Sequence, residues 1–224
     1  MKIGILWDLD GTLLDSLEDL KDSVNHTLEQ YGLPVRTLEE IRRFVGNGAR
    51  RLIALSMPGK ADDPDVDAVL RDYQVYYTAH SQIKTKPYDG VVAALETLGK
   101  KYPMAVVSNK PDEAVKVLCK QYFPGVYAMG ESADCPRKPA PDMVRKAMKV
   151  LGVEACVYVG DSEVDVKTAG NAGVPCLSVL WGFRDRKMLE EAGGRYFCED
   201  TGKLADTLER IVAEVYGNAK ASQS

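Results

Sequence analysis

The sequence predicts an α/β fold, a Rossmann-like parallel sheet core with helices on both faces, plus an inserted all-helical cap domain. The first observation is that four short apolar runs are continuous rather than alternating, which is typical of strands buried on both faces. These runs are residues 3–7, 104–108, 155–159 and 175–180. The second is that amphipathic helical patterns lie between the later runs, and such alternation forms right-handed crossovers in a parallel sheet. The helical patterns are residues 111–121, 141–151 and 163–172.

The third observation is that residues 16–83 interrupt this alternation with helical patterns and carry no strand signal. Ser16 is the expected N-cap of the first helix, and Gly32 is its expected stop. Further patterns cover residues 37–46 and 64–81. We therefore expect a helical cap inserted between the first and second strands of the sheet.

These patterns divide the chain into three parts. Residues 1–15 and 84–216 are expected to form the α/β core, and residues 16–83 the helical cap. Residues 84–90 would return the chain to the sheet, and the small polar residues 217–224 are expected to form a disordered tail.

Composition excludes several classes of function. The chain has 224 residues, of which 45% are hydrophobic and 28% charged, and its net charge is −4. This charge balance argues against general nucleic-acid binding, which normally requires a basic surface. No apolar run approaches the roughly 18 residues that span a bilayer, and the first residues lack the pattern of a signal peptide. We therefore expect a cytoplasmic protein without nucleic-acid or membrane partners.

Cysteine and histidine supply little chemistry. The five cysteines are odd in number and show no C-x-x-C or zinc spacing, which favours reduced thiols. His26 and His80 both fall in expected helices and are interpreted as bystanders.

The stretch "LWDLDGTLLDS", residues 6–16, can be interpreted as a hairpin turn, a calcium loop or an enzyme site. A hairpin requires alternating strands on both sides, and the run before Asp8 does not alternate. A calcium loop requires glycine at its sixth position, whereas Gly11 comes fourth. A strand end with two carboxylates remains. One of them, Asp8 or Asp10, can attack an electrophile while the other exchanges a proton with the leaving group.

Three more polar stretches follow, or lie close to, expected strand ends, where open parallel sheets place their ligands. In "VVSNKP", Ser108 or Asn109 can cap a helix, or the Ser108 hydroxyl and nearby N–H groups can bind phosphoryl oxygens. In "RKPAPD", Lys138 is either a solvated lysine in a turn or the cation that neutralises a phosphate. In "VGDSEVD", Ser162 and Asp165 can form a capping box, or Asp161 can bind a hard cation with Asp165 behind it.

Taken together, these stretches point to one site. Carboxylates at two strand ends, a hydroxyl at a third and one cation suit a magnesium phosphoester. Independent helix caps would not be expected to supply this complementary set in order. The sequence therefore predicts Mg²⁺ as cofactor and a small phosphorylated metabolite as partner.

With these residues in view, the sequence resembles the haloacid dehalogenase-like hydrolase superfamily. The matching motifs are "DLDGTLLD", "VVSNK", "RKPAP" and "GDSEVDVKTAGNAG", in the order of that family. The helical insertion resembles the small α-helical cap of the family. Within it, the chain is most similar to phosphoglycolate phosphatases, through "YGLPVRTLEEIRRFVGNGARRLI" and "KPYDGV". One departure is Trp7, where the family usually has Phe.

The resemblance implies a mechanism. Asp8 attacks phosphorus and forms an aspartyl-phosphate, and Asp10 first protonates the leaving alkoxide and then activates water. Asp8, the backbone carbonyl of Asp10 and Asp161 are the implied ligands of Mg²⁺.

The resemblance also implies binding roles. Ser108 and Lys138 bind the transferring oxygens, and Asp165 orients Lys138 or a metal-bound water. The tight turn needs Gly11, and Thr12 contacts phosphate through its N–H or hydroxyl. Two residues are assigned by position only, with Asn109 next to the substrate and Ser162 in support of Asp165.

Cap residues are expected to choose the substrate. Gly46-Asn47-Gly48 is interpreted as a specificity loop, and its backbone or Arg50 would meet an anionic group at the far end of the substrate. Arg50 is equally well interpreted as a surface cation. Lys110 can be interpreted as facing the leaving group or as a surface cation. Asp15 is interpreted as a hinge residue.

Two other functions stay open. One is a phosphomutase or phosphonate hydrolase on the same scaffold. A mutase would need a cap residue poised to handle a second hydroxyl, and a phosphonate hydrolase would need a Schiff-base lysine from the cap, which offers Lys21 and Lys60, neither in a convincing context. The other is a catalytically silent binding protein, against which the four intact motifs argue. The oligomeric state, monomer or homodimer, is likewise left open by the sequence.

Overall fold

Six parallel strands form the central sheet in this computed structural model, which describes residues 1–59 and 65–217. The strand order is β5-β4-β1-β6-β7-β8. The strands are β1 (Ile3–Trp7), β4 (Met104–Pro111), β5 (Tyr127–Glu131), β6 (Ala155–Gly160), β7 (Cys176–Val179) and β8 (Tyr196–Cys198). The predicted fold class, a parallel α/β sheet, is confirmed.

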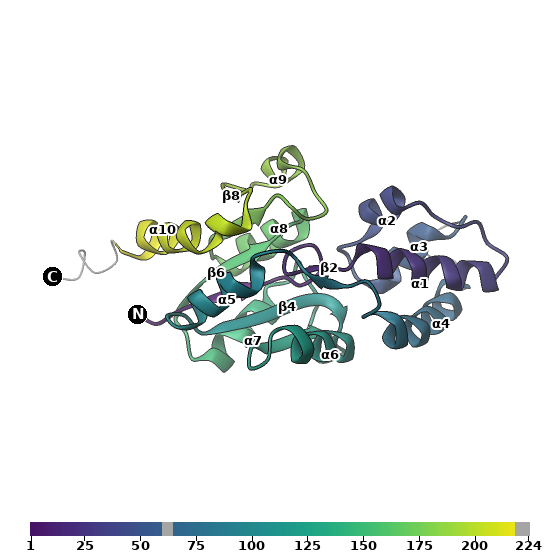
Figure 1. Cartoon of the computed structure of the whole chain (residues 1–224), viewed down its shortest axis with the longest axis horizontal. Helices are drawn as coiled ribbons and strands as arrows, with labels where there is room; N and C mark the ends of the chain where they lie inside the picture. Colours follow the sequence, from purple (N-terminus) through teal and green to yellow (C-terminus); the bar gives the residue numbers. More distant parts are fainter. Residues whose placement is uncertain (60–64, 218–224) are drawn as a thin grey trace.

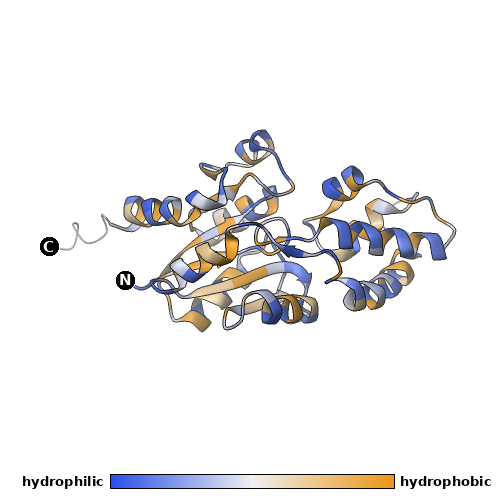
Figure 2. Cartoon of the chain, viewed as in Figure 1, coloured by the Kyte–Doolittle hydropathy of each residue, from blue (hydrophilic) through white to orange (hydrophobic). Residues whose placement is uncertain are grey.

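Helices cover both faces of this sheet. One face carries α5 (Val91–Gly99), α6 (Asp112–Tyr122) and α10 (Leu204–Tyr216), and the other carries α7 (Asp142–Leu151) and α8 (Glu163–Ala172). Successive side chains of a strand point to opposite faces, so Trp7 packs with the first group and Leu6 with the second. Figure 2 shows the strands as largely apolar, which is the hydropathy expected of a doubly covered sheet. The short helices α9 (Arg186–Glu191) and η1 (Thr201–Lys203) complete the core.

Some elements differ from the sequence-based expectation. Strand β4 continues to Pro111 rather than ending at residue 108, and α6 begins at Asp112 with Pro111 at its N-cap. Ser108 and Asn109 therefore lie in the extended end of the strand, and the suggestion that one of them caps a helix is wrong. The edge strands β5 and β8 and the helices α5 and α10 were not predicted.

The residues between β2 (Leu14–Asp15) and β3 (Lys86–Pro87) that the structure describes are helical. They form α1 (Leu17–Gln30), α2 (Leu38–Phe44), α3 (Ala49–Ser56) and α4 (Asp65–His80), which gather at the right of Figure 1. We call these four helices and their connections the helical segment. They share a hydrophobic cluster that includes Val24, Ile53 and Tyr73, and Ala114 and Phe183 of the core pack into it.

Two helices of the helical segment differ in how their first turns are capped. Thr37 and Glu40 form a capping box at the start of α2. Ser16 occupies the N-cap position of α1, but its hydroxyl makes no capping hydrogen bond and donates to Asp10 instead. Helix α3 was not predicted as a separate element.

The chain leaves the sheet and returns to it at one place. Strands β2 and β3 pair antiparallel, with Asp15 opposite Lys86. The buried carboxylate of Asp19 accepts hydrogen bonds from the backbone N–H groups of Lys84 and Thr85 and from the Thr85 hydroxyl. These contacts tie the start of α1 to the returning chain, and they place Asp15 in the connection rather than in the pocket described below.

The remaining sequence-based expectations concern side chains and the terminus. All five cysteines are free, and His26 and His80 stack on the two faces of the Tyr76 ring. Within residues 1–59 and 65–217, no helix has the length and apolar character needed to cross a bilayer. Residues 218–224 of the expected tail lie outside the described residues, and so does Lys60.

Candidate active site

A pocket with about 580 Å³ of open space lies between the carboxyl ends of the sheet strands and the helical segment. On the core side it is lined by Asp8, Asp10, Ser108, Asn109, Lys110, Pro111, Lys138, Asp161, Ser162 and Phe183. On the other side it is lined by Leu20, Val45, Gly46, Gly48, Ala49, Leu52, Tyr73 and Tyr77. The core thus supplies most of the polar groups, and the helical segment supplies a mainly apolar and aromatic wall.

Asp8 follows directly after β1 and is buried. Its N–H group donates to the Val159 carbonyl at 2.8 Å, which fixes the backbone to strand β6. Its Oδ1 accepts from the N–H of Leu9 at 2.7 Å and lies 2.8 Å from Nζ of Lys138. Burial, together with the negative charge of Asp165, raises the pKa of the Asp8 carboxyl well above its usual range.

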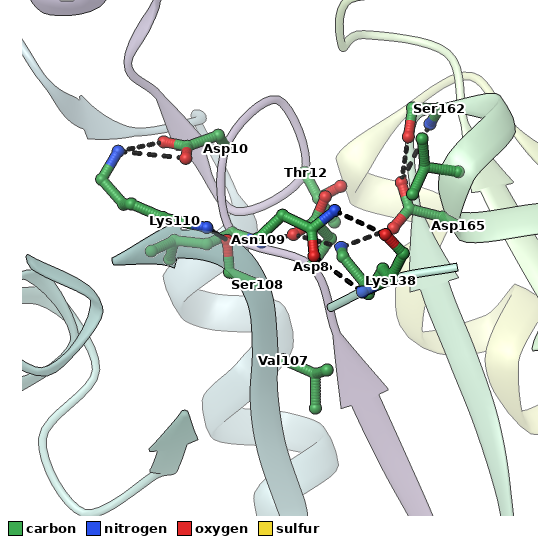
Figure 3. A network of polar contacts seen from close by, with 12 residues as sticks. Asp8, Asp10, Thr12, Val107, Ser108, Asn109, Lys110, Lys138, Ser162 and Asp165 are labelled. Atoms are coloured by element: carbon green, nitrogen blue, oxygen red, sulfur yellow. Dashed lines mark hydrogen bonds and ion pairs between the residues drawn. The ribbon is translucent and has the colours of Figure 1, made fainter. Parts of the chain in front are cut away.

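The Lys138 ammonium group lies between the carboxylates of Asp8 and Asp165. Its Nζ lies 2.8 Å from both Asp8 Oδ1 and Asp165 Oδ1 and donates to the Tyr158 hydroxyl at 3.1 Å (Figure 3). Burial alone would lower the pKa of Lys138, but the carboxylates of Asp165 and Asp8 hold it well above its usual range. The lysine is therefore a fixed positive charge at the floor of the pocket.

The side-chain amide of Asn109 positions the lysine backbone. Its Oδ1 accepts from the Lys138 N–H at 2.8 Å, and its Nδ2 donates to the Lys138 carbonyl at 3.0 Å and to the Gly46 carbonyl at 3.1 Å. Ser108, one residue earlier, accepts from the Lys110 N–H at 3.2 Å and lines the pocket. Asn109 thus links the core lysine to the helical segment.

Asp10 lies on the turn after β1, where Figure 3 shows it opposite Lys110. The Lys110 ammonium donates to Asp10 Oδ1 at 2.8 Å and to Oδ2 at 3.0 Å, and the Ser16 hydroxyl donates to Oδ1 at 2.5 Å. Lys110 is buried, with its Nζ 4.6 Å from the centre of the Tyr77 ring. This places Lys110 at the pocket, against Asp10.

The last two carboxylates come from the β6–α8 junction. Asp161 is buried, and it accepts hydrogen bonds from the Thr12 hydroxyl at 3.1 Å and from the Phe183 N–H at 2.7 Å. Asp165 Oδ2 accepts from the Ser162 hydroxyl at 2.6 Å and from its N–H at 3.1 Å. The Ser162–Asp165 interaction and the contact of Asp165 with Lys138 therefore coexist, because each uses a different oxygen.

This donor set fits a hard divalent cation. Oxygen atoms of Asp8, Asp161 and Asp165 lie within 4.8 Å of one another. Asp165 is engaged by the charged Lys138 ammonium and by Ser162, whereas the two Asp161 oxygens accept from the neutral Thr12 hydroxyl and Phe183 N–H. Asp8 and Asp161 are therefore better suited than Asp165 to face a cation. Burial, then the charge of Asp165, raises the pKa of Asp161 to about 7. The three carboxylates face only one ammonium group, that of Lys138. A hard divalent cation would neutralise the negative charge that remains.

Two glycines shape the surroundings of Asp161. Gly11 has a φ of +79°, and a Cβ there would lie 2.3 Å from Asp161 Oδ2. A Cβ at Gly182 would lie 2.4 Å from the Cβ and Oδ2 atoms of Asp161 and from the Gly11 carbonyl. The backbone therefore approaches this carboxylate from two sides, which only glycine permits.

The remaining predicted residues are divided between the pocket and its surroundings. Gly46 and Gly48 line the pocket, and Asn47 between them does not. Arg50 donates to Asp67 at 2.8 Å on the exposed surface of the helical segment and is not among the pocket-lining residues. Lys21 pairs with Glu18 and Asp22, also away from the lining.

Sequence reasoning missed several residues of this region. They are Tyr73, Tyr77, Tyr158, Gly182, Phe183 and Arg184. The fragment "WGFR" that contains three of them follows the expected strand at 175–180, and this position after a strand end was the available signal.

The sequence and structure of this chain are similar to those of known proteins. Residues 5–179 match the family model described as haloacid dehalogenase-like hydrolase, which is more than half of the chain. The chain belongs to the haloacid dehalogenase-like hydrolase family. The resemblance inferred from the four motifs is therefore confirmed.

Relatives within the family cover most of the chain. The chain is 34% identical to phosphoglycolate phosphatase 1 of Pseudomonas aeruginosa over 200 residues, covering 84% of this chain and 73% of that protein. It is 35% identical to a phosphoglycolate phosphatase of Rhodobacter capsulatus over 193 residues, covering 82% and 87%. A crystal structure from Lactobacillus delbrueckii subsp. bulgaricus, provisionally named a phosphoglycolate phosphatase, has a TM-score of 0.86 and 36% identity, covering 92% and 97%. These findings confirm the expected enzyme class, a family hydrolase acting on phosphoric monoesters.

Proposed function

We propose that this hydrolase is a Mg²⁺-dependent phosphatase that cleaves a small phosphomonoester through an aspartyl-phosphate on Asp8, with 2-phosphoglycolate as the leading substrate. The observation that carries the proposal is the position of Lys138, whose ammonium group lies 2.8 Å from both Asp8 and Asp165. Asp161 and Asp10 border the same pocket. A nucleophile, a fixed cation, a cation-binding carboxylate and a second carboxyl group therefore meet at one point.

In the first step, a carboxylate oxygen of Asp8 attacks phosphorus in line, and the bond from phosphorus to the ester oxygen breaks. The carboxyl group of Asp10 donates its proton to the leaving alkoxide. Asp10 is two residues along the same turn and lines the same pocket, so both groups can reach the opposite sides of one phosphoryl group.

In the second step, the carboxylate of Asp10 takes a proton from a water molecule that attacks the phosphorus of the aspartyl-phosphate. Inorganic phosphate leaves, and Asp8 returns to its free carboxylate form. Over the two steps Asp10 gives one proton to the alkoxide and takes one from water, so one water is consumed for each ester cleaved.

Charge on the transferring group is balanced by this chain's own residues and by the cation. Lys138 and the Ser108 hydroxyl bind phosphoryl oxygens at the floor of the pocket, where Asn109 holds the lysine backbone. Asp8, Asp161 and the backbone carbonyl of Asp10 would hold Mg²⁺, with Asp165 behind them. Bound Mg²⁺ would supply Lewis-acid neutralisation of the negative charge between nucleophile and phosphate.

The helical segment supports the choice of a small substrate. Its apolar and tyrosine side chains close the pocket opposite the carboxylates, which would exclude bulk water from the reaction. We propose Gly46, Asn47 and Gly48 as the specificity loop, with Lys110 and Asn109 also near the substrate. The names of the relatives favour 2-phosphoglycolate. We further propose a cytoplasmic enzyme that works as a monomer or homodimer on a small metabolite.

A panel of phosphorylated metabolites compared by kcat/KM tests this proposal. We expect activity on p-nitrophenyl phosphate that requires Mg²⁺, and the highest kcat/KM for 2-phosphoglycolate. If 2-phosphoglycolate ranks among the poorest substrates, the narrower assignment is wrong and the phosphatase assignment stands. A phosphomutase would instead convert a sugar monophosphate to its isomer without releasing phosphate. A silent binding protein would bind phosphate esters and turn none over.

A further inference from the structure

Arg184 connects the core to the helical segment. It lies in the loop between β7 and α9, and its side chain is 4% exposed. Nη1 donates to the carbonyl of Arg42 at 2.7 Å, and Nη2 donates to the carbonyl of Val45 at 2.7 Å and to that of Arg43 at 3.5 Å. Nε donates to the Glu163 carboxylate of α8 at 2.9 Å. Both ends of the guanidinium are therefore engaged, one by each part of the molecule.

The carbonyls that Arg184 binds belong to the end of helix α2, whose last residue is Phe44. The last carbonyl groups of a helix have no partner within the helix and carry partial negative charge. A guanidinium is always charged and presents several donors in one plane, so it can satisfy several such carbonyls at once. Arg184 thus completes a helix terminus that the helical segment leaves open.

The same helix end continues into pocket-lining residues. The Gly46 carbonyl accepts from Asn109, and a Cβ at Gly46 would lie 3.6 Å from Arg184 Nη2. A Cβ at Gly48 would lie 3.0 Å from the Glu131 carboxylate, and its φ of +82° also favours glycine. Residues 45–48 are therefore held against the core from two sides, by Arg184 and by Asn109.

The loop that carries Arg184 also contacts Asp161, one of the three clustered carboxylates of the site. The N–H of Phe183 donates to Asp161 Oδ2 at 2.7 Å, while the Phe183 side chain packs into the hydrophobic cluster of the helical segment. Two consecutive residues therefore contact a carboxylate of the site and the helical segment together. A displacement of this loop would therefore change the surroundings of Asp161 and the loop's packing against the helical segment.

We propose that Arg184 is a positioning residue, which fixes residues 45–48 against the pocket and thereby sets how tightly the non-reacting end of the substrate is held. The proposal rests on the proposed function in so far as it concerns substrate. Arg184 does not line the pocket, so its effect passes through the backbone of residues 45–48. A residue that served only the overall stability of the fold would not affect this loop selectively.

Two measurements on the full chain test the proposal with the variant Arg184→Met. Hydrogen exchange without substrate should show faster exchange in residues 42–48, while α7 in the core keeps its protection. For 2-phosphoglycolate, KM should rise about tenfold, with kcat within about threefold of wild type, because binding rather than chemistry is weakened. Arg186→Met is the matched control, because Arg186 is the first residue of α9, two residues further along the chain, and pairs with Glu190 and Glu199 at the surface.

Two milder variants keep the test open if Arg184→Met does not fold. Arg184→Lys retains the charge but not the planar set of donors, so KM should recover partly. Glu163→Gln keeps the acceptor and removes its charge, so it should give a smaller change in the same direction. Unchanged exchange in residues 42–48, or faster exchange spread over the whole chain, would overturn the proposal. A wild-type protein that hydrolyses no monoester would overturn the proposed function, whereas exchange would still decide whether Arg184 fixes the loop.

Discussion

The ammonium group of Lys110 lies 2.8 and 3.0 Å from the two carboxylate oxygens of Asp10, and both residues border the pocket. Asp10 is also held by Ser16, at the entrance to helix α1. The carboxyl group assigned to proton transfer is therefore fixed by one residue of the sheet and one residue at the start of the helical segment. Its position depends on both parts of the molecule.

Replacing Lys110 by Met should lower kcat for an alkyl phosphate by about 10- to 100-fold, because Asp10 loses the contact that orients it for proton transfer. Met keeps most of the buried aliphatic volume, so the free energy of unfolding should fall by less than about 2 kcal/mol. Steady-state kinetics and urea unfolding measure the two effects. Lys116→Met, at an exposed lysine on α6, is the control. An unchanged kcat would show that the Asp10 contact is irrelevant to turnover.

Asp8→Asn should reduce kcat by at least about a thousandfold, because an amide oxygen is too weak a nucleophile to form the acyl-phosphate. Stability to urea should not fall, since the substitution removes a buried charge next to Asp161 and Asp165, and Lys138 keeps Asp165 as partner. Asp206→Asn, at an exposed position in α10, should change neither quantity. Turnover by Asp8→Asn near the wild-type rate would rule out the aspartyl-phosphate route.

Lys138→Met should destabilise the protein strongly, by about 3–5 kcal/mol, because Asp8 and Asp165 would remain buried without their cation. The double variant Lys138→Met/Asp165→Asn should recover part of that free energy of unfolding, since one unpaired charge is removed with the lysine. Neither variant should hydrolyse p-nitrophenyl phosphate. Urea unfolding of both variants measures the difference, and a double variant no more stable than the single one would contradict the pairing.

Mg²⁺ should raise the Tm of the wild-type protein, because an ion that binds only the folded state stabilises it by about 2.7 kcal/mol at a hundred times its Kd. A chelator should remove both this shift and the activity. Asp161→Asn should lose the shift, whereas Asp142→Asn, at the exposed start of α7, should keep it. Thermal unfolding with and without Mg²⁺ measures these shifts. An equal shift in Asp161→Asn would place the ion elsewhere.

Gly182→Ala should weaken Mg²⁺ binding by about tenfold or more, because the added Cβ would lie 2.4 Å from atoms of Asp161 and displace a ligand. Gly170→Ala provides the contrast. Nothing lies within 4 Å of a Cβ at Gly170, in helix α8, so that substitution should stabilise the protein by about 0.5–1 kcal/mol. Calorimetric titration with Mg²⁺ compares the two variants. Equal affinities would mean that the Gly182 approach is not needed.

The sequence predicted the parallel sheet because its inner strands are continuous apolar runs, as at β1 and β6. It did not predict β5 and β8, because "YAMGE" mixes apolar residues with Gly and Glu, and "YFC" is only three residues long. The end of β4 was placed too early because Ser108 and Asn109 are typical of helix caps. The Asn109 side chain instead binds the backbone of Lys138, and the Ser108 hydroxyl accepts from the Lys110 N–H and lines the pocket.

Within the site, the sequence indicated side chains that act through their own chemical groups, such as Asp8 and Lys138. It could not indicate contributions made through the backbone, since the Phe183 N–H that binds Asp161 is common to every residue except proline. Arg184 was missed for a related reason. Its partners in the helical segment are carbonyl groups about 140 residues away, and backbone carbonyls leave no signature in the order of residue types.

Because β2 pairs with β3, the helical segment begins and ends at points that are adjacent in space. The cost of closing such a connection rises only slowly with its length, so the length of the insertion adds little to the cost of folding the sheet. The insertion is therefore a module in the evolutionary sense. It can be lengthened, shortened or exchanged as one piece, and the range of accepted molecules can diversify while the strands that carry the carboxylates stay unaltered.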